Sequence, residues 1–166
     1  MGWQVRFHTG GPALPAPYST EQPGTWTGHG ADTDAFSGTA VYSTRFDAPE
    51  QSVLTGWWVN LGEVRESARV RLNGVELGTL ILPPFQIALP ALKPTGNVLE
   101  VEVTNLAGNR IRDLDRRGVH WHEFHDIGFV NIDYKPFNAS GWPVQPSGLL
   151  GPVTITRRDL SLSYDG

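Results

Sequence analysis

Residues 68–80 read Ala-Arg-Val-Arg-Leu-Asn-Gly-Val-Glu-Leu-Gly-Thr-Leu. Apolar and polar residues alternate on both sides of Asn73-Gly74, a pattern typical of strands with one buried face and one solvated face. Asn and Gly both accept the positive φ angles of a type I′ turn, whose twist matches that of two antiparallel strands. The stretch therefore predicts a β-hairpin that turns at Asn73-Gly74.

Strand patterns recur along the rest of the chain, whereas helical patterns are weak. The predicted strands are residues 3–7, 39–46, 53–61, 85–89, 98–103 and 149–156. Nineteen glycines and thirteen prolines supply the turns that many short strands require. Residues 107–117 carry six charged side chains and predict either one or two helical turns or a charged loop, in which Asp113 and Asp115 are solvated beside arginines.

This pattern predicts an all-β fold in which two antiparallel sheets pack face to face as a sandwich. The length of 166 residues suits a single domain that spans residues 1–166 and buries a core without disulfides. The residues expected to face inward are Val41, Tyr42, Val70, Leu72, Leu99, Val101, Val103 and Val153.

Composition excludes several classes of function. The chain has no cysteine, which excludes disulfides, thiolate metal sites and thiol catalysis. The net charge is −4 and no basic block is present, so we expect no nucleic-acid partner. No apolar run approaches the roughly 20 residues that span a membrane, and the N-terminus lacks a signal-peptide pattern. We expect a soluble protein without a membrane partner, and both a secreted and a cytoplasmic location stay open.

Several stretches resemble a known group of domains. The first set comprises residues 61–64, 68–74, 77–79, 84–85 and 97–105. It is similar to the sugar-binding-like β-sandwich of family 2 glycoside hydrolases, an antiparallel jelly roll of the galactose-binding-domain type. The second set comprises residues 3–7, 37–42, 109–113 and 147–153. It narrows the resemblance to the C-terminal sandwich of large α-L-rhamnosidases of the family 106 type.

The resemblance implies a carbohydrate-binding or accessory module that is non-catalytic by itself and stands beside a separate catalytic barrel. The catalytic carboxylates of that family lie in the barrel, so none is carried over to this chain. The implied partners are a carbohydrate or other small-molecule ligand and the catalytic domain of a larger enzyme. Residues 57–60 and 120–125 depart from the family pattern, with Trp-Trp-Val-Asn and three histidines. These departures keep an alternative open, a stand-alone or engineered enzyme with a cleft lined by His and Trp.

Ligand-binding residues are expected mainly in residues 107–148, a long irregular segment that either forms a pocket or only covers a sheet. Indole rings stack on the flat C–H faces of sugars, while Asn, Asp, Arg and His bind hydroxyls. Neighbouring strand residues point to opposite faces, so one of Trp57 and Trp58 is expected in the core. We expect the other to form the opposite wall of the pocket. The predicted ligand-binding residues are Trp57, Trp58, Asn105, Asn109, Arg110, Trp121, His122, Asp126, Tyr134 and Trp142.

The histidine cluster offers two interpretations. His120, His122 and His125 suit a transition metal such as Zn²⁺, with Glu123 or Asp126 orienting an imidazole. The same histidines also suit a polar loop in which they form local hydrogen bonds. We expect no cofactor, and a divalent metal at this cluster is the alternative. In the enzyme alternative the catalytic residues are His120, His122, His125 and Asp126, with one histidine acting as base or metal ligand.

Overall fold

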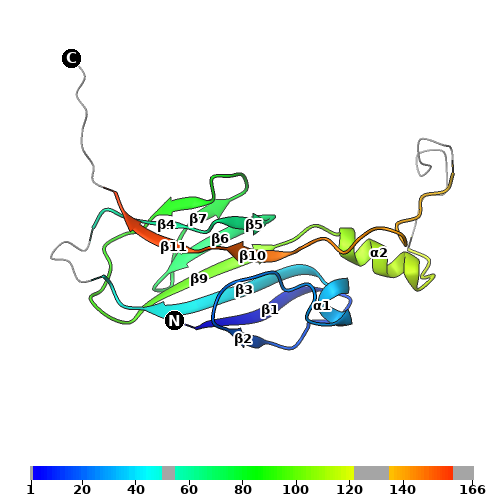
Figure 1. Ribbon diagram of the computed structural model, residues 1–166, viewed down its shortest axis with the longest axis horizontal. Coiled ribbons are helices and arrows are strands. Elements are labelled where there is room, and N and C mark those ends of the chain that lie inside the picture. The colour runs from blue at the N-terminus through cyan, green and yellow to red at the C-terminus, as the bar shows by residue number, and fades with distance from the viewer. Residues whose placement is uncertain (1, 50–54, 122–134, 159–166) are drawn as a thin grey trace, which may run out of the picture.

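The structure is a computed structural model that describes residues 2–49, 55–121 and 135–158. Its described residues form eleven strands and two short helices (Figure 1). The elements are β1 (Trp3–Gly11), β2 (Tyr18–Thr20), α1 (Ala31–Ala35), β3 (Ser37–Phe46), β4 (Trp57–Asn60), β5 (Glu63–Arg65), β6 (Ser67–Leu72), β7 (Val75–Leu80), β8 (Gln86–Ala88), β9 (Asn97–Thr104), α2 (Gly108–Arg116), β10 (Gly148–Gly151) and β11 (Thr154–Arg157). The predicted all-β sandwich is confirmed.

One layer of the sandwich is a six-stranded antiparallel sheet in the order β2-β1-β3-β9-β6-β7. Its inner face is built from rows of side chains that cross four strands, because the register places apolar residues opposite one another. The three rows are Phe7–Ala40–Val103–Ala68, Val5–Tyr42–Val101–Val70 and Trp3–Thr44–Leu99–Leu72. Thr44 is the polar member, and its hydroxyl donates to the Gly2 carbonyl at 2.8 Å.

The facing layer consists of a three-stranded sheet, β11-β4-β8, and a two-stranded sheet, β10-β5. Trp57, Val59, Leu61, Val64 and Leu149 are buried from this side and share one core with the six-stranded sheet. A cluster of aromatic rings extends this core, with edge-to-face contacts among Phe7, Trp26 and Phe36 at centroid distances of 4.9–5.9 Å. The core therefore joins both layers.

The predicted hairpin is confirmed. β6 and β7 pair through a two-residue turn in which Asn73 has φ 52° and Gly74 has φ 82°. The Asn73 side chain also accepts a hydrogen bond from the Val98 amide at 2.9 Å, which ties the turn to β9. Both φ angles are those of a type I′ turn, as the Asn-Gly pair requires.

Three predictions on local structure need correction. The single late strand at 149–156 is wrong, because the chain breaks at Gly151-Pro152 into β10 and β11, and proline has no N–H for a ladder. Val41 does not face the core with Tyr42, because consecutive strand residues point to opposite faces; it is buried on the other face of β3. The predicted strand 53–61 is shorter, with β4 at Trp57–Asn60, and residues 53 and 54 lie outside the described part.

The charged stretch at 107–117 is a helix, α2, that runs for nine residues. Arg117 and Asp113 form an ion pair at 2.7 Å across one turn, as expected for a solvated charged face. The other side of α2 packs on the end of the sandwich. It carries the buried Asn109.

Candidate functional site

A groove of about 540 Å³ lies where α2 meets the end of the sandwich. We call it the Trp142 groove. It is lined by Arg65 and Glu66 beyond β5, by Asn105 beyond β9, by Ile111 on α2, and by Trp142 and Gln145 from the segment that leads into β10. Three of the predicted residues, Asn105, Asn109 and Trp142, are thus brought together here.

The buried amide of Asn109 holds one wall of this groove in place. Asn109 is 1% exposed, and its amide group donates to the Gln145 carbonyl at 2.9 Å. Its oxygen accepts from the Gln145 amide at 2.8 Å. This two-way contact replaces a strand ladder for a segment that has no strand partner at this point, since buried main-chain groups require partners.

Asn105 anchors the opposite side. Its oxygen accepts from the Gly38 amide at 2.9 Å, and its nitrogen donates to the Phe36 carbonyl at 3.1 Å and to the Ser147 hydroxyl at 3.0 Å. Both amides are therefore engaged within the protein, and they shape the groove rather than offering groups to a ligand. This corrects their predicted role as ligand-binding residues.

An aromatic cluster forms the rim of the groove. The Phe137 ring contacts the edges of Trp121 and Trp142, with centroid distances of 6.1 and 5.6 Å. The Arg112 guanidinium donates to the Trp142 carbonyl at 2.6 Å, which fixes the segment to α2. Trp142 remains 43% exposed, so its indole presents an open surface at the groove.

Asp115 is a residue that the sequence-based interpretation missed. It was expected in a solvated turn, but it is partly buried and accepts from the Trp121 indole N–H at 2.6 Å and from the Ala139 amide at 2.6 Å. Asp115 thereby joins the two halves of the segment to α2. Phe137 was also missed, and its aromatic type within an irregular segment was the one available indication.

Arg110 serves the fold rather than the groove. Its guanidinium lies against the backbone of Gly11, where an added Cβ would stand 2.9 Å from Cζ. The Nη1 atom is buried and has no hydrogen-bond partner among the described residues. Arg110 is also absent from the lining of the Trp142 groove, so its predicted place in the ligand site is not supported by this geometry.

The two adjacent tryptophans of β4 are separated by the strand geometry. Trp57 is 3% exposed and belongs to the core. Trp58 is on the outer face, where the Arg158 guanidinium lies 4.5 Å from its ring centroid. β4 and α2 lie far apart along the long axis of the molecule (Figure 1), so Trp58 does not form the opposite wall of the Trp142 groove.

Four of the predicted site residues, His122, His125, Asp126 and Tyr134, lie outside the described residues, as does Glu123. His120 is described and is exposed. In the described ranges, no three His, Cys, Asp or Glu side chains are grouped so as to hold a metal ion. The metal and catalytic interpretations of this cluster stay predictions. Among the described helices, none has the length and apolar character to cross a membrane.

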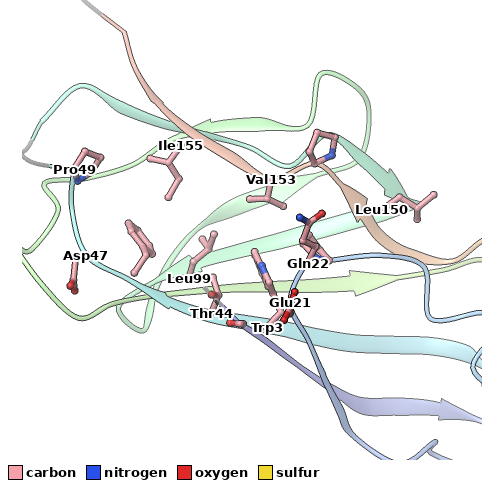
Figure 2. Close-up of a pocket in the computed structure, with 14 residues that line it drawn as sticks. Trp3, Glu21, Gln22, Thr44, Asp47, Pro49, Leu99, Leu150, Val153 and Ile155 are labelled. Carbon is pink, nitrogen blue, oxygen red and sulfur yellow. Dashed lines mark hydrogen bonds between the residues drawn. The ribbon is translucent and has the colours of Figure 1, made fainter.

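A second and larger hollow opens between the two layers at the other end of β3 and β9 (Figure 2). We call it the inter-sheet cleft. Its volume is about 1220 Å³. Trp3, Phe46 and Leu99 lie on the side of the six-stranded sheet, and Val153 and Ile155 on the side of β11. Polar groups stand at its edge, including those of Glu21, Gln22 and Asp47.

The chain is similar to parts of much larger enzymes. No protein-family model matches it. A curated protein of Formosa agariphila named "Putative beta-glucuronidase" is 34% identical over 140 residues, which cover 72% of this chain and 12% of that protein. The structure of a rhamnosidase from Novosphingobium sp. PP1Y matches with a TM-score of 0.73 and 28% identity, over 93% of this chain and 14% of that chain. A Bifidobacterium dentium beta-glucuronidase matches with a TM-score of 0.52 and 25% identity, over 63% and 19%.

These matches define the class of the chain. It is a β-rich domain similar to domain-sized parts of glycoside hydrolases, and it spans less than a fifth of each of these three relatives. This similarity agrees with an accessory domain rather than with a complete hydrolase.

Proposed function

We propose that this chain is a non-catalytic accessory domain of a glycoside hydrolase and that its Trp142 groove binds carbohydrate. The observation that carries the first part is the partial coverage, since the matched region is 12% of a curated relative and 14% of a rhamnosidase. A separate catalytic domain of the larger enzyme is the implied partner.

Within this class we propose a parent enzyme of the family 106 α-L-rhamnosidase type and a galactose-binding-like jelly-roll fold. The rhamnosidase match extends over 93% of this chain, whereas the Bifidobacterium dentium beta-glucuronidase match extends over 63%. The longer match supports rhamnose-containing glycans as the first ligands to test. Fold alone does not fix function, so the ligand must be argued from the site.

The chemistry of the Trp142 groove supports a sugar. The exposed Trp142 indole offers a flat apolar surface, and buried aromatic rings contribute through areas of about 150–250 Å². Glu66 and Arg65 supply an acceptor and a donor beside it. Arg65 pairs with Glu63 at the surface, and such exposed pairs contribute only about 0–1 kcal/mol, so its guanidinium can turn to a hydroxyl at little cost.

Calorimetric titration with rhamnose-containing and galacturonan oligosaccharides tests this proposal. We expect weak binding to the unmodified chain. In Trp142→Ala the association constant falls by about tenfold or more, which corresponds to roughly 1.4 kcal/mol of lost stacking. Trp58→Ala is the matched control, since it removes a surface tryptophan outside the groove and leaves the affinity unchanged.

The outcomes separate the two parts of the proposal. Silence across a broad oligosaccharide panel removes carbohydrate binding and leaves a scaffold role. Binding that Trp142→Ala leaves intact moves the site away from this groove. Hydrolysis of aryl glycosides by the purified chain, abolished by His120→Ala, would replace the accessory role with the enzyme alternative.

A further inference from the structure

The inter-sheet cleft is the largest hollow in the described part of the chain, and the Trp142 groove does not account for it. Its floor is the end row of the six-stranded sheet, with Trp3 and Leu99, followed by Phe46 (Figure 2). Elsewhere in the sandwich such a row is covered by the facing layer. Here an apolar floor and an apolar roof stand apart, which is unfavourable in water unless something fills the space.

The roof of the cleft ends in a free strand edge. β11 is the last strand of its sheet, with β4 as its neighbour. The Arg158 amide donates to the Gly56 carbonyl at 2.9 Å, and the register places Thr156 opposite Trp58. Main-chain groups alternate in direction along an antiparallel strand, so those of Ile155 point away from β4. They are directed along the open side of the cleft.

The floor extends beyond this edge. β8 contacts β7, so the order β8-β4-β11 runs above β7-β6-β9 and leaves β3 and β1 uncovered beyond β11. Strands in a sheet are about 4.8 Å apart, so two uncovered strands leave room for one or two extended segments. A second copy that paired through its own β11 would bring its own projecting β3 and β1 into the same space. The geometry therefore fits a single segment rather than a dimer.

The charge of the cleft defines the segment further. Glu21 and Asp47 line it, and none of its described lining residues is an arginine, lysine or histidine. The Asp47 carboxylate accepts from the Gly96 amide at 2.8 Å, which holds one oxygen and leaves the other for a cation. Residues 159–166 of this chain carry two aspartates and no basic residue, so their charge does not match.

We propose that the inter-sheet cleft binds one extended, basic polypeptide segment from the rest of the longer glycoside hydrolase. The segment pairs with the free edge of β11 and places every second side chain, an apolar one, between the two sheets. A lysine or arginine of the segment reaches Glu21 or Asp47. This inference rests on the proposed accessory role, but not on carbohydrate binding.

Selection from a random library of ten-residue peptides on the unmodified chain tests the chemistry of the cleft. We expect enriched peptides that alternate apolar and polar residues, contain Lys or Arg, and lack Asp and Glu. For the best synthetic peptide, N-methylation at every second position weakens binding by about tenfold, whereas methylation at the positions between changes it by less than about twofold. On binding, the Ile155 amide gains protection in hydrogen exchange followed by NMR.

Charge variants complete the test. Glu21→Gln is expected to weaken the peptide by about threefold to tenfold, and Glu76→Gln, an exposed carboxylate on β7 outside the cleft, leaves it unchanged. Enrichment of acidic or non-alternating peptides, or binding without protection of Ile155, overturns the proposal. Oligosaccharides that shift the resonances of Trp3 and Ile155 would also overturn it, because the cleft would then be a sugar site. Neither result touches the effect of Trp142→Ala.

Discussion

Replacement of Asn109 by alanine should unfasten the wall of the Trp142 groove at a cost that the structure defines. The side chain is 1% exposed and satisfies both the N–H and the C=O of Gln145. An unsatisfied buried polar group costs about 1–3 kcal/mol. Gln145 itself is an exposed residue, so water partly replaces the lost partners. We therefore expect Asn109→Ala to lower the free energy of unfolding by about 2–4 kcal/mol.

Urea denaturation followed by tryptophan fluorescence measures this change. The midpoint should fall while the slope of free energy against urea stays constant, because the surface exposed on unfolding is nearly the same. Asn138→Ala is the matched control, since Asn138 is exposed and accepts one local bond from the Ser140 amide at 2.8 Å. We expect a change within about 0.5 kcal/mol for that control. A loss from Asn109→Ala no larger than that of Asn138→Ala would refute the anchoring role.

Three further predictions follow from the core and from the histidine cluster. Leu72→Ala should destabilise the chain by about 2–5 kcal/mol in the same assay, because Leu72 is 1% exposed in the central core. Burial raises the pKa of the Tyr42 phenol above its ordinary value, so the folded state holds that proton more tightly than the unfolded state. Stability should be unaffected by this group below pH about 10 and fall as the pH rises above it, and Tyr42→Phe should show a flatter alkaline limb in urea titrations at several pH values. Elemental analysis of the purified chain should find no stoichiometric transition metal, and one metal per chain lost on His122→Ala would favour the enzyme alternative.

The sheet framework was predictable because its determinants are local. Alternation over residues 68–72 and 98–103 fixes which side chains face inward, and the Asn-Gly pair fixes the register of β6 with β7. Val41 was misplaced because two neighbouring residues of one strand were both assigned to the core. The late strand was misplaced because the break at Gly151-Pro152 was read as part of one apolar run.

The candidate site was less predictable because its contacts join distant parts of the chain. Asn109 meets Gln145 across 36 positions, and its composition reads equally well as a ligand contact or as an anchor. Trp142 and Trp121 were expected together, but their link through Phe137 depends on how the segment folds back on α2. The inter-sheet cleft depends on how far one layer extends past the other, which no local pattern records.

The Trp142 groove and the inter-sheet cleft should act independently, because they lie at opposite ends of one rigid strand. Leu99 near the start of β9 lines the cleft, and Asn105 just beyond its end lines the groove. Six residues of extended strand separate them, which corresponds to about 20 Å. Effects at sites more than about 10 Å apart without shared partners usually add. Trp142→Ala should therefore leave the affinity for the selected peptide unchanged, and Glu21→Gln should leave any oligosaccharide affinity unchanged. Titration of each variant with both ligands measures this directly, and a change of more than about twofold in either cross-titration would mean that the two ends are coupled through the sheet.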